Sequence, residues 1–395
     1  MDNLYELKIR LDCLCIFRQL LEDKVVSSLY DYLKNPGCSA YAEFVSALYN
    51  SNDGDLSGHI CDICENSENV YVRRIGSGKA VPAHLKQALN AELATLQAVA
   101  DLTPLTLTKP LGYQGFLPKF SATNVNLAQN YLHRADNIGK YGFGIYAKNC
   151  MFYVDENNCV AAVKHPDKTE LSDLIGYDAQ RQIVIDNTKA LLDGKPAANI
   201  LLTGDAGTGK SSSVKAVANA LYSHGLRIIE IRKDQLRAIP KILDELSENP
   251  LKFILFIDDL SFLKDDDNFN ALKAVLEGTV TAKSNNVVIY ATSNRRHIIK
   301  EKFSDRDGDD VHRNDTMQEL ISLSERFGIH ITFGKPDKKT YLHIAKNLAQ
   351  KSGISMPQAE FDLLAERFAL ERGGRSARLA RQFVDGLLCK QHSDN

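Results

Sequence analysis

The spacing of apolar and polar residues changes twice along the 395 residues of this chain. Between residues 144 and 163, short apolar runs flank a turn, which predicts a β-hairpin or meander. From residue 200 onward, short apolar runs alternate with helical stretches, and this pattern predicts a parallel sheet with helices on both faces. Before residue 105, apolar residues recur at helical spacing. The helices that we expect there cover 11–33, 40–49 and 82–100.

These changes of pattern predict three domains. Pro166 ends the hairpin pattern, because proline removes a backbone donor, and we place the first boundary there. Residues 1–165 then form a mainly helical N-terminal accessory or interaction domain that includes the β-hairpin. An α/β core follows over 166–334, and a helical segment covers 335–395, starting near Pro336.

The first buried run of the core leads into a glycine-rich turn and then into a helical stretch. Glycines lack a β-carbon, so the backbone can curl around phosphate oxygens and direct its N–H groups inward at a helix N-terminus. Lys210 would reach the β- and γ-phosphates, and the Ser211 hydroxyl would ligate Mg²⁺. A chance glycine turn would not need both the strand before it and the helix after it. The sequence therefore predicts a nucleoside triphosphate site made of Gly204, Asp205, Ala206, Gly207, Thr208, Gly209, Lys210, Ser211 and Ser212.

Polar side chains follow two further apolar runs. The run 251–257 ends in Asp258 and Asp259, which would lie at the carboxyl end of a strand, where α/β sheets bind ligands. We expect Asp258 to hold Mg²⁺, and Asp259 to orient and deprotonate the attacking water. The alternative, a surface acidic turn, leaves the apolar run unexplained. The run 286–291 is followed by Asn294, whose amide can contact the γ-phosphate or the water.

Together these motifs resemble an AAA+ ATPase module. The segments that carry the resemblance are GDAGTGKS (204–211), FILFIDD (253–259), YATSN (290–294), SERFG (324–328) and GGRSAR (373–378). Within the superfamily, IDDLSF, SLSERFG and GGRSARLARQFVD are similar to a bacterial AAA+ family without an assigned function. The resemblance covers about 171–388. It implies that 166–334 is an AAA+ P-loop ATPase core using ATP and Mg²⁺, and that 335–395 is a helical lid.

The resemblance also implies roles for single residues. Asn294 corresponds to sensor 1, and Arg326 to the arginine finger that reaches the ATP of a neighbouring subunit. Such a finger contributes about 10³ to 10⁵ in rate, or about 4 to 7 kcal/mol, because it neutralises charge that grows on the phosphoryl oxygens. The active form would then be a homo-oligomer, with a hexameric ring as one arrangement. The competing interpretation of Arg326 is a surface ion pair with a neighbouring acid.

Two more assignments come from the resemblance. Ile175 and Gly176 resemble the segment that lies against the adenine. Arg375 is our choice for sensor 2 on the lid, with Arg378, one helical turn further on, as the alternative.

Asp259 departs from the pattern of many AAA+ proteins, which have glutamate at this position. Aspartate is one methylene shorter and positions water less well, so we expect slow turnover. The same aspartate pair resembles the replication-initiator branch of the superfamily, so the difference does not imply inactivity.

Composition limits the partners. A formal net charge of −2 and a pI near 6.6 give no general attraction to nucleic acid or membranes. No apolar run approaches the ~20 residues of a membrane span, and the N-terminus lacks the pattern of a signal peptide, so we expect a cytoplasmic protein. Cys61 and Cys64 form one CxxC pair without a second pair, which does not favour zinc.

Three functions remain open. The first is an oligomeric ATPase that remodels or switches a protein partner held by the N-terminal domain. The second is a nucleic-acid-associated loader or initiator-like ATPase, weakly favoured by Arg295 and Arg296 after the Asn294 strand. The third is a nucleotide-gated scaffold with little turnover. The segment 232–236 lacks the aromatic residue and glycine of a threading pore loop, which disfavours processive threading of a polypeptide.

Overall fold

The computed structural model describes residues 2–260, 267–277, 285–294 and 325–393. The chain divides into two compact units. Met1–Lys148 and Glu248–Leu251 form the N-terminal unit, and Asn149–Ser247 and Lys252–Asn395 form the second. None of the described helices is long and apolar enough to cross a membrane.

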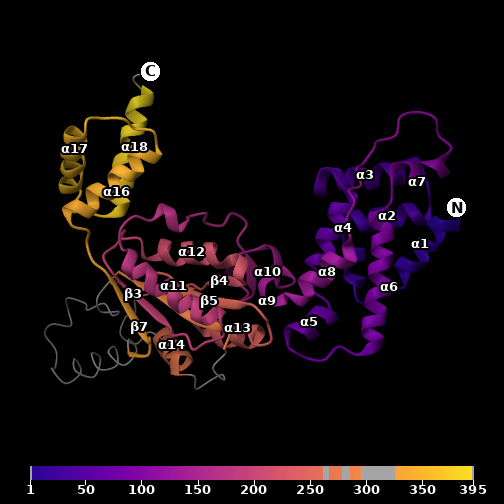
Figure 1. Ribbon diagram of the computed structural model, residues 1–395, viewed down its shortest axis with the longest axis horizontal. Helices are drawn as coiled ribbons and strands as arrows, with labels where there is room; N and C mark the ends of the chain where they lie inside the picture. The colour runs from indigo at the N-terminus through magenta and orange to yellow at the C-terminus, as the bar shows by residue number, and fades with distance from the viewer. Residues whose placement is uncertain (1, 261–266, 278–284, 295–324, 394–395) are drawn as a thin grey trace. The chain divides into compact units, whose positions relative to one another are not determined.

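The N-terminal unit consists of helices around one hydrophobic core (Figure 1). Leu29, Phe44, Leu48 and Leu96 are completely buried in that core. The helices are α1 (Asp2–Asp12), α2 (Lys24–Lys34), α3 (Cys38–Asn52), α4 (Leu56–Glu65), α5 (Val70–Gly76), α6 (Ala83–Ala100), α7 (Pro104–Thr108), α8 (Leu127–Asp136), α9 (Ile138–Tyr141) and α10 (Ile145–Lys148), with the 3₁₀ turns η1 (Arg18–Glu22) and η2 (Lys109–Leu111). The helical character that we predicted before residue 105 is therefore confirmed, although the bounds of the helices differ.

The helix that we expected over 11–33 is interrupted, and a buried glutamate accounts for the break. Glu92 of α6 is 6% exposed. Its carboxylate accepts hydrogen bonds from the backbone N–H groups of Ile16 (3.0 and 3.1 Å) and Phe17 (2.9 Å). Because the side chain satisfies these donors, the backbone does not need to continue the helix.

The second unit contains a seven-stranded sheet in the order β2-β1-β4-β5-β6-β3-β7. All neighbouring strands are parallel except the pair β1 and β2. Figure 1 shows α12 above the strands and α13 and α14 below them. The strands are β1 (Met151–Val154), β2 (Val160–Ala162), β3 (Ile200–Gly204), β4 (Leu226–Glu230), β5 (Lys252–Ile257), β6 (Val287–Ser293) and β7 (Ile329–Phe333). The helices of the core are α11 (Asp178–Leu192), α12 (Lys210–Leu221), α13 (Ile239–Leu246) and α14 (Asp267–Glu277), with the 3₁₀ turns η3 (Leu171–Asp173), η4 (Tyr222–His224) and η5 (Lys233–Ala238).

The β-hairpin lies elsewhere than we predicted. We assigned it to the N-terminal domain, but β1 pairs in parallel with β4, and the hairpin extends the sheet of the second unit. Pairing satisfies the backbone groups of β4 that would otherwise form an open sheet edge. The two compact units accordingly divide after Lys148 rather than at Pro166. The expected strand at 144–147 is instead part of the short helix α10.

The order of the strands decides which side chains can meet. β6 lies between β3, which leads into the glycine-rich turn, and β5, which ends at the two aspartates. Because these three strands are parallel, their carboxyl ends meet at one edge of the sheet. The predicted class, a mostly parallel α/β sheet with helical N-terminal and C-terminal parts, is confirmed.

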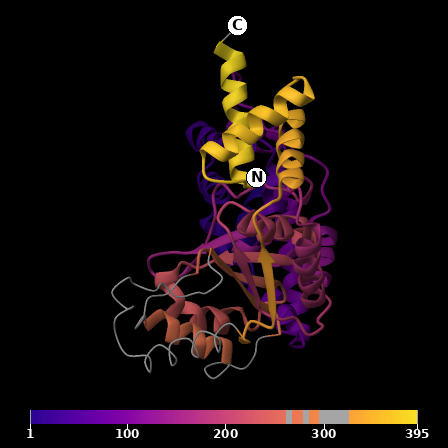
Figure 2. The same cartoon turned by 90° about the vertical axis from the view of Figure 1, so that its left-hand side faces the viewer.

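The C-terminal part consists of α16 (Lys338–Lys351), α17 (Gln358–Glu371) and α18 (Ala377–Ser393). Figure 2 shows these helices at the yellow end of the colour scale. They form a hydrophobic core of their own around Tyr341, Phe361 and Phe383. Asp337 caps α16, because its side chain accepts a hydrogen bond from the N–H of Thr340 at 2.7 Å.

Candidate functional site

The glycine-rich turn between β3 and α12 requires glycine at specific positions. Gly204, Gly207 and Gly209 all have positive φ angles, of 136°, 77° and 92°. A β-carbon on Gly204 would also lie 2.0 Å from the carbonyl oxygen of Phe333. The loop can adopt this conformation because these three positions have no side chain. It leads directly to the N-terminus of α12.

Lys210 lies beneath this turn and is 5% exposed. Its Nζ atom donates hydrogen bonds to the carbonyl oxygens of Gly204 (2.9 Å) and Asp205 (2.8 Å), and to Oδ1 of Asn294 (2.9 Å). Burial lowers the pKa of Lys210, and the nearby carboxylates, that of Asp205 foremost, partly offset this effect. The site thus holds a primary amine between the turn and the end of β6.

Ser211 and Asp258 lie together at the first turn of α12. The Ser211 hydroxyl donates a hydrogen bond to Oδ1 of Asp258 at 2.6 Å, and the Thr292 hydroxyl donates to the same oxygen at 2.5 Å. A hydroxyl and a carboxylate are hard oxygen ligands, and Mg²⁺ is usually held by one or two such groups together with substrate phosphates and water. The residues therefore fit Mg²⁺. Among the described residues there is no group of three or more metal-binding side chains, which a site with only protein ligands would need.

Asp259 has an unusual backbone conformation. Its φ angle is 51°, in the left-handed region that non-glycine residues rarely adopt, and such strain often occurs at functional sites. Three hydrogen bonds hold it there, one of them from its N–H to Oδ1 of Asp258 at 3.1 Å. Its N–H donates to the Thr292 hydroxyl at 3.0 Å, and its carboxylate accepts from the Asn294 amide at 2.7 Å. Asn294 therefore contacts both Lys210 and Asp259.

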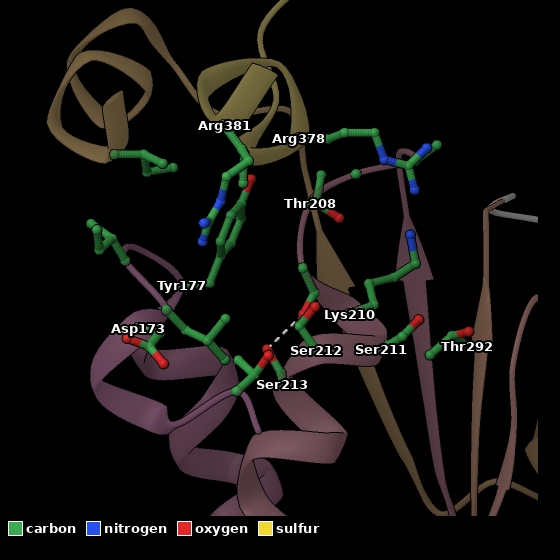
Figure 3. Close-up of a pocket in the computed structure, with 18 of the residues that line it drawn as sticks. Asp173, Tyr177, Thr208, Lys210, Ser211, Ser212, Ser213, Thr292, Arg378 and Arg381 are labelled. Atoms are coloured by element: carbon green, nitrogen blue, oxygen red, sulfur yellow. Dashed lines mark hydrogen bonds between the residues drawn. The ribbon is translucent and has the colours of Figure 1, made fainter. Parts of the chain in front are cut away.

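These groups line one cavity of about 700 Å³, within the range of small-molecule sites (Figure 3). Of the predicted residues, those that line it are Ile175, Ala206, Gly207, Thr208, Gly209, Lys210, Ser211, Ser212, Asp258, Asp259 and Asn294. Gly204 and Asp205 contribute carbonyl groups to Lys210 beside it, and Gly176, with a φ of 75°, precedes Tyr177 of the lining.

Sequence reasoning missed part of the wall around Tyr177. This residue also has a positive φ, of 59°, and its ring lies 5.1 Å from that of Phe333. Its hydroxyl donates to the carbonyl oxygen of Gly334 at 2.5 Å, which fixes the side chain at the cavity. Figure 3 shows Tyr177 and Asp173 on one side of the cavity and Lys210 and Ser211 on the other.

Two arginines of α18 also line the cavity, and neither is Arg375, which we chose for sensor 2. Arg378 and Arg381 extend from α18 over the cavity (Figure 3). The backbone N–H of Arg378 donates to the carbonyl oxygen of Gly207 at 3.3 Å, so α18 contacts the glycine-rich turn directly. Arg375 instead donates two hydrogen bonds to Glu366, at 2.9 and 2.8 Å, and does not line the cavity. Arg378, the alternative for sensor 2, lines the cavity, and that role remains a prediction.

Arg326 does not line the cavity that contains Lys210 and Asp258. It forms an ion pair with Glu277 at 2.5 Å, and both residues line a separate cavity that also includes Gly328. The ion pair is the competing interpretation that the sequence left open. A role as an arginine finger requires a second copy and remains a prediction. Arg295 and Arg296 lie outside the described residues.

Comparisons with known proteins give one family match and a set of similar solved structures. Residues 147–391 match the family model described as "Protein of unknown function (DUF815)". No curated protein matches the chain. Among solved structures, the RuvB Holliday junction branch migration motor of Thermotoga maritima has 16% identity and a TM-score of 0.38, over 55% of this chain and 63% of that one. PCH-2 of C. elegans has 19% identity and a TM-score of 0.38, over 54% and 63%. This chain thus spans less than two thirds of either solved chain.

Proposed function

The chain belongs to the family described as protein of unknown function (DUF815), and we propose that it is an AAA+ protein that hydrolyses ATP. It binds ATP at the glycine-rich turn, hydrolyses it with Mg²⁺, and uses the cycle to remodel or switch a macromolecular partner. The active form is a homo-oligomer, for which a hexameric ring is one arrangement, and the N-terminal unit holds a protein partner.

One observation carries the proposal. Three segments far apart in the sequence contribute to one hydrogen-bonded cluster, in which Asn294 contacts both Lys210 and Asp259. Beside it, Ser211 contacts Asp258. A cation, a hydroxyl and two carboxylates at a helix N-terminus are the groups that phosphoryl transfer requires.

In the proposed reaction the N–H groups of the turn bind the phosphates. Lys210 exchanges its carbonyl partners for β- and γ-phosphate oxygens, and Ser211 and Asp258 hold Mg²⁺. When bound, Mg²⁺ neutralises charge that develops on the phosphoryl oxygens. Asp259 accepts the proton of the attacking water, and Asn294 positions that carboxylate.

Residues from the lid and from a second copy complete the proposed site. Arg378 and Arg381 contact the triphosphate from α18 and couple its presence to the position of the lid. Arg326 of one copy would leave Glu277 and reach the ATP of the next. This exchange of partners makes hydrolysis depend on assembly.

The experiment is phosphate release by the purified chain with Mg·ATP, compared with Lys210→Ala. We expect the variant to lose at least about a hundredfold in rate, equivalent to about 2.7 kcal/mol of barrier. Lys189→Ala, an exposed position on α11, is the matched control and keeps wild-type activity. No Mg²⁺-dependent hydrolysis by the wild type, or equal activity in Lys210→Ala, would contradict the proposal.

A second candidate is a nucleotide-gated scaffold with little turnover. It is favoured by the short Asp259 side chain, whose carboxylate is already hydrogen-bonded to Asn294 and so less free to position water. Tight ATP binding without measurable hydrolysis at high protein concentration supports this candidate over the first.

A further inference from the structure

The N-terminal unit contains a second cavity, of about 420 Å³, that the sequence did not indicate. Its charged residues, which we call the basic cleft, are Arg18, Arg73, Arg74 and Lys79 together with Glu68 and Glu248. All six belong to the N-terminal unit, because Glu248–Leu251 belongs to it. The cleft therefore shares no lining residue with the P-loop cavity, which belongs to the second unit.

Two of the four cations already have carboxylate partners. Arg73 pairs with Glu68 at 2.6 Å, and Lys79 pairs with Glu248 at 2.8 Å. Both pairs are largely exposed to solvent, and such pairs contribute little to stability, so an incoming anion can compete for their cations.

Among the described residues, the side chains of the other two cations donate hydrogen bonds to backbone carbonyl groups. Arg18 donates from Nη1 to the oxygen of Asp12 at 2.9 Å, and Arg74 donates from Nε to the oxygen of Ala80 at 3.1 Å. Within the described part of the chain, no carboxylate pairs with either arginine. Each guanidinium has five N–H donors, so most of the donors of Arg18 and Arg74 are available to a ligand.

Hydrogen bonds to Glu92 hold the part of the cleft wall that contains Cys15 and Ile16. The buried carboxylate of Glu92 accepts hydrogen bonds from the backbone N–H and the thiol of Cys15, at 3.0 and 2.9 Å, and from the N–H groups of Ile16 and Phe17. These bonds fix the segment that leads into Arg18. A binding site on a fixed wall loses less conformational entropy when its ligand binds.

We propose that the basic cleft binds an acidic peptide segment of the protein partner, with Arg18 and Arg74 as the residues that recognise its carboxylates. A guanidinium binds a carboxylate through two parallel hydrogen bonds, which gives both strength and orientation. This inference rests on the proposed function for the identity of the partner, whereas binding of the peptide itself does not require ATP hydrolysis.

The charge distribution favours a peptide over a nucleic acid. Residues 1–148 contain 14 lysines and arginines against 15 aspartates and glutamates, so the unit has no general excess of positive charge. The cleft is a local exception. Glu68 and Glu248 at the cleft would repel any anion, but a peptide can place neutral residues beside them, whereas a nucleic acid carries a phosphate at every nucleotide.

The test is fluorescence anisotropy with the full chain and a fluorescein-labelled peptide in which glutamate alternates with glycine. The matched probes are the same peptide with glutamine in place of glutamate, a single-stranded oligonucleotide, and inorganic phosphate as a competitor. We expect the glutamate peptide to bind, with an affinity that falls as salt increases, and at least tenfold more tightly than the glutamine peptide. We expect Arg18→Gln/Arg74→Gln to weaken binding at least tenfold.

The control is Lys86→Gln/Lys140→Gln, which removes two exposed charges of the same unit outside the cleft and should bind like the wild type. Arg18→Lys keeps the charge but loses the paired hydrogen bonds, and its affinity should be intermediate. The proposal would be overturned by an equal loss of peptide affinity in both double variants or by no binding of the glutamate peptide at low salt. A preference for the oligonucleotide or for phosphate would also overturn it. ATP hydrolysis is measured on the same samples. If Arg18→Gln/Arg74→Gln loses peptide binding but still hydrolyses ATP at the wild-type rate, the effect is located in the cleft. If the wild type binds the peptide but does not hydrolyse ATP, only the proposed ATPase activity is contradicted.

Discussion

The side-chain amide of Asn294 lies 2.7 Å from the carboxylate of Asp259 and donates a hydrogen bond to it. The oxygen of the same amide accepts a hydrogen bond from Lys210. A single side chain at the end of β6 thus connects the cation proposed to bind phosphate with the carboxylate proposed to activate water. This connection depends on β6 lying between β3 and β5.

Replacing Asn294 should therefore slow hydrolysis more than it weakens binding. We expect Asn294→Ala to lower kcat about 10- to 100-fold, or about 1.4 to 2.7 kcal/mol, because Asp259 loses the group that holds it. The affinity for ATP, measured with a fluorescent ATP analogue, should change less than threefold. Asn347→Ala, on α16 outside the cavity, is the control. A variant that loses affinity and rate equally would argue against a positioning role.

The lid arginines should separate into two classes. Arg378→Ala and Arg381→Ala should each raise the Kd for ATP about tenfold, because both side chains line the cavity. Arg375→Ala should leave the Kd unchanged, since its guanidinium is bound to Glu366. Isothermal titration with Mg·ATP distinguishes these expectations. Weakened binding in Arg375→Ala alone would restore our original choice for sensor 2.

The Arg375–Glu366 pair should affect stability in acid. The hydrogen bonds from Arg375 lower the pKa of Glu366 below its ordinary value of 4.5. A carboxylate with a lowered pKa in the folded state contributes stability that is fully present above the unfolded value and is lost as the pH falls. The thermal midpoint of the wild type should therefore fall more between pH 6 and about pH 3.5 than that of Arg375→Gln. Parallel midpoints for the two proteins would show that the pair has no such role.

Gly204 should be the least replaceable glycine of the turn. Gly204→Ala places a β-carbon against the carbonyl of Phe333 and strains a φ of 136°, so we expect a loss of about 3 kcal/mol or more in the free energy of unfolding. Gly194 also has a positive φ, of 70°, but has open space around it. Gly194→Ala should therefore lower the free energy of unfolding by about 1 to 2 kcal/mol. Denaturant unfolding gives both values. Equal losses would mean that the contact with Phe333 is relieved by movement.

Arg326 offers a test of assembly. If it acts on the ATP of a neighbouring copy, Arg326→Ala should lose about 10³-fold in rate while still binding ATP. Mixing Arg326→Ala with Lys210→Ala should restore activity, because an intact Lys210 of one copy can then meet an intact Arg326 of the other. Activity that stays absent in the mixture while both proteins assemble would exclude action between copies.

The sequence predicted the P-loop and the acidic strand because both are local patterns. Gly204, Lys210 and Ser211 lie in one turn, and Asp258 and Asp259 directly follow the apolar strand that positions them. Their convergence could also be expected, because parallel strands present their carboxyl ends at the same edge of a sheet. The sequence therefore placed the centre of the candidate site.

The remaining features depend on contacts between distant segments. The break before α2 depends on Glu92, more than seventy residues away, and the position of the β-hairpin depends on which strand edge is open to it. Arg381 was missed, although it follows Arg378 by three residues and so lies on the same face of α18, a spacing that could have indicated it.

Whether this site hydrolyses ATP through Asp259 is decided by comparing ATP binding and phosphate release in the wild type and in Asp259→Asn. We expect the wild type to bind and hydrolyse Mg·ATP, and the variant to bind ATP with a similar Kd but to release phosphate at least about a hundredfold more slowly. Hydrolysis by Asp259→Asn at the wild-type rate, or failure of the wild-type chain to bind ATP, would contradict this expectation.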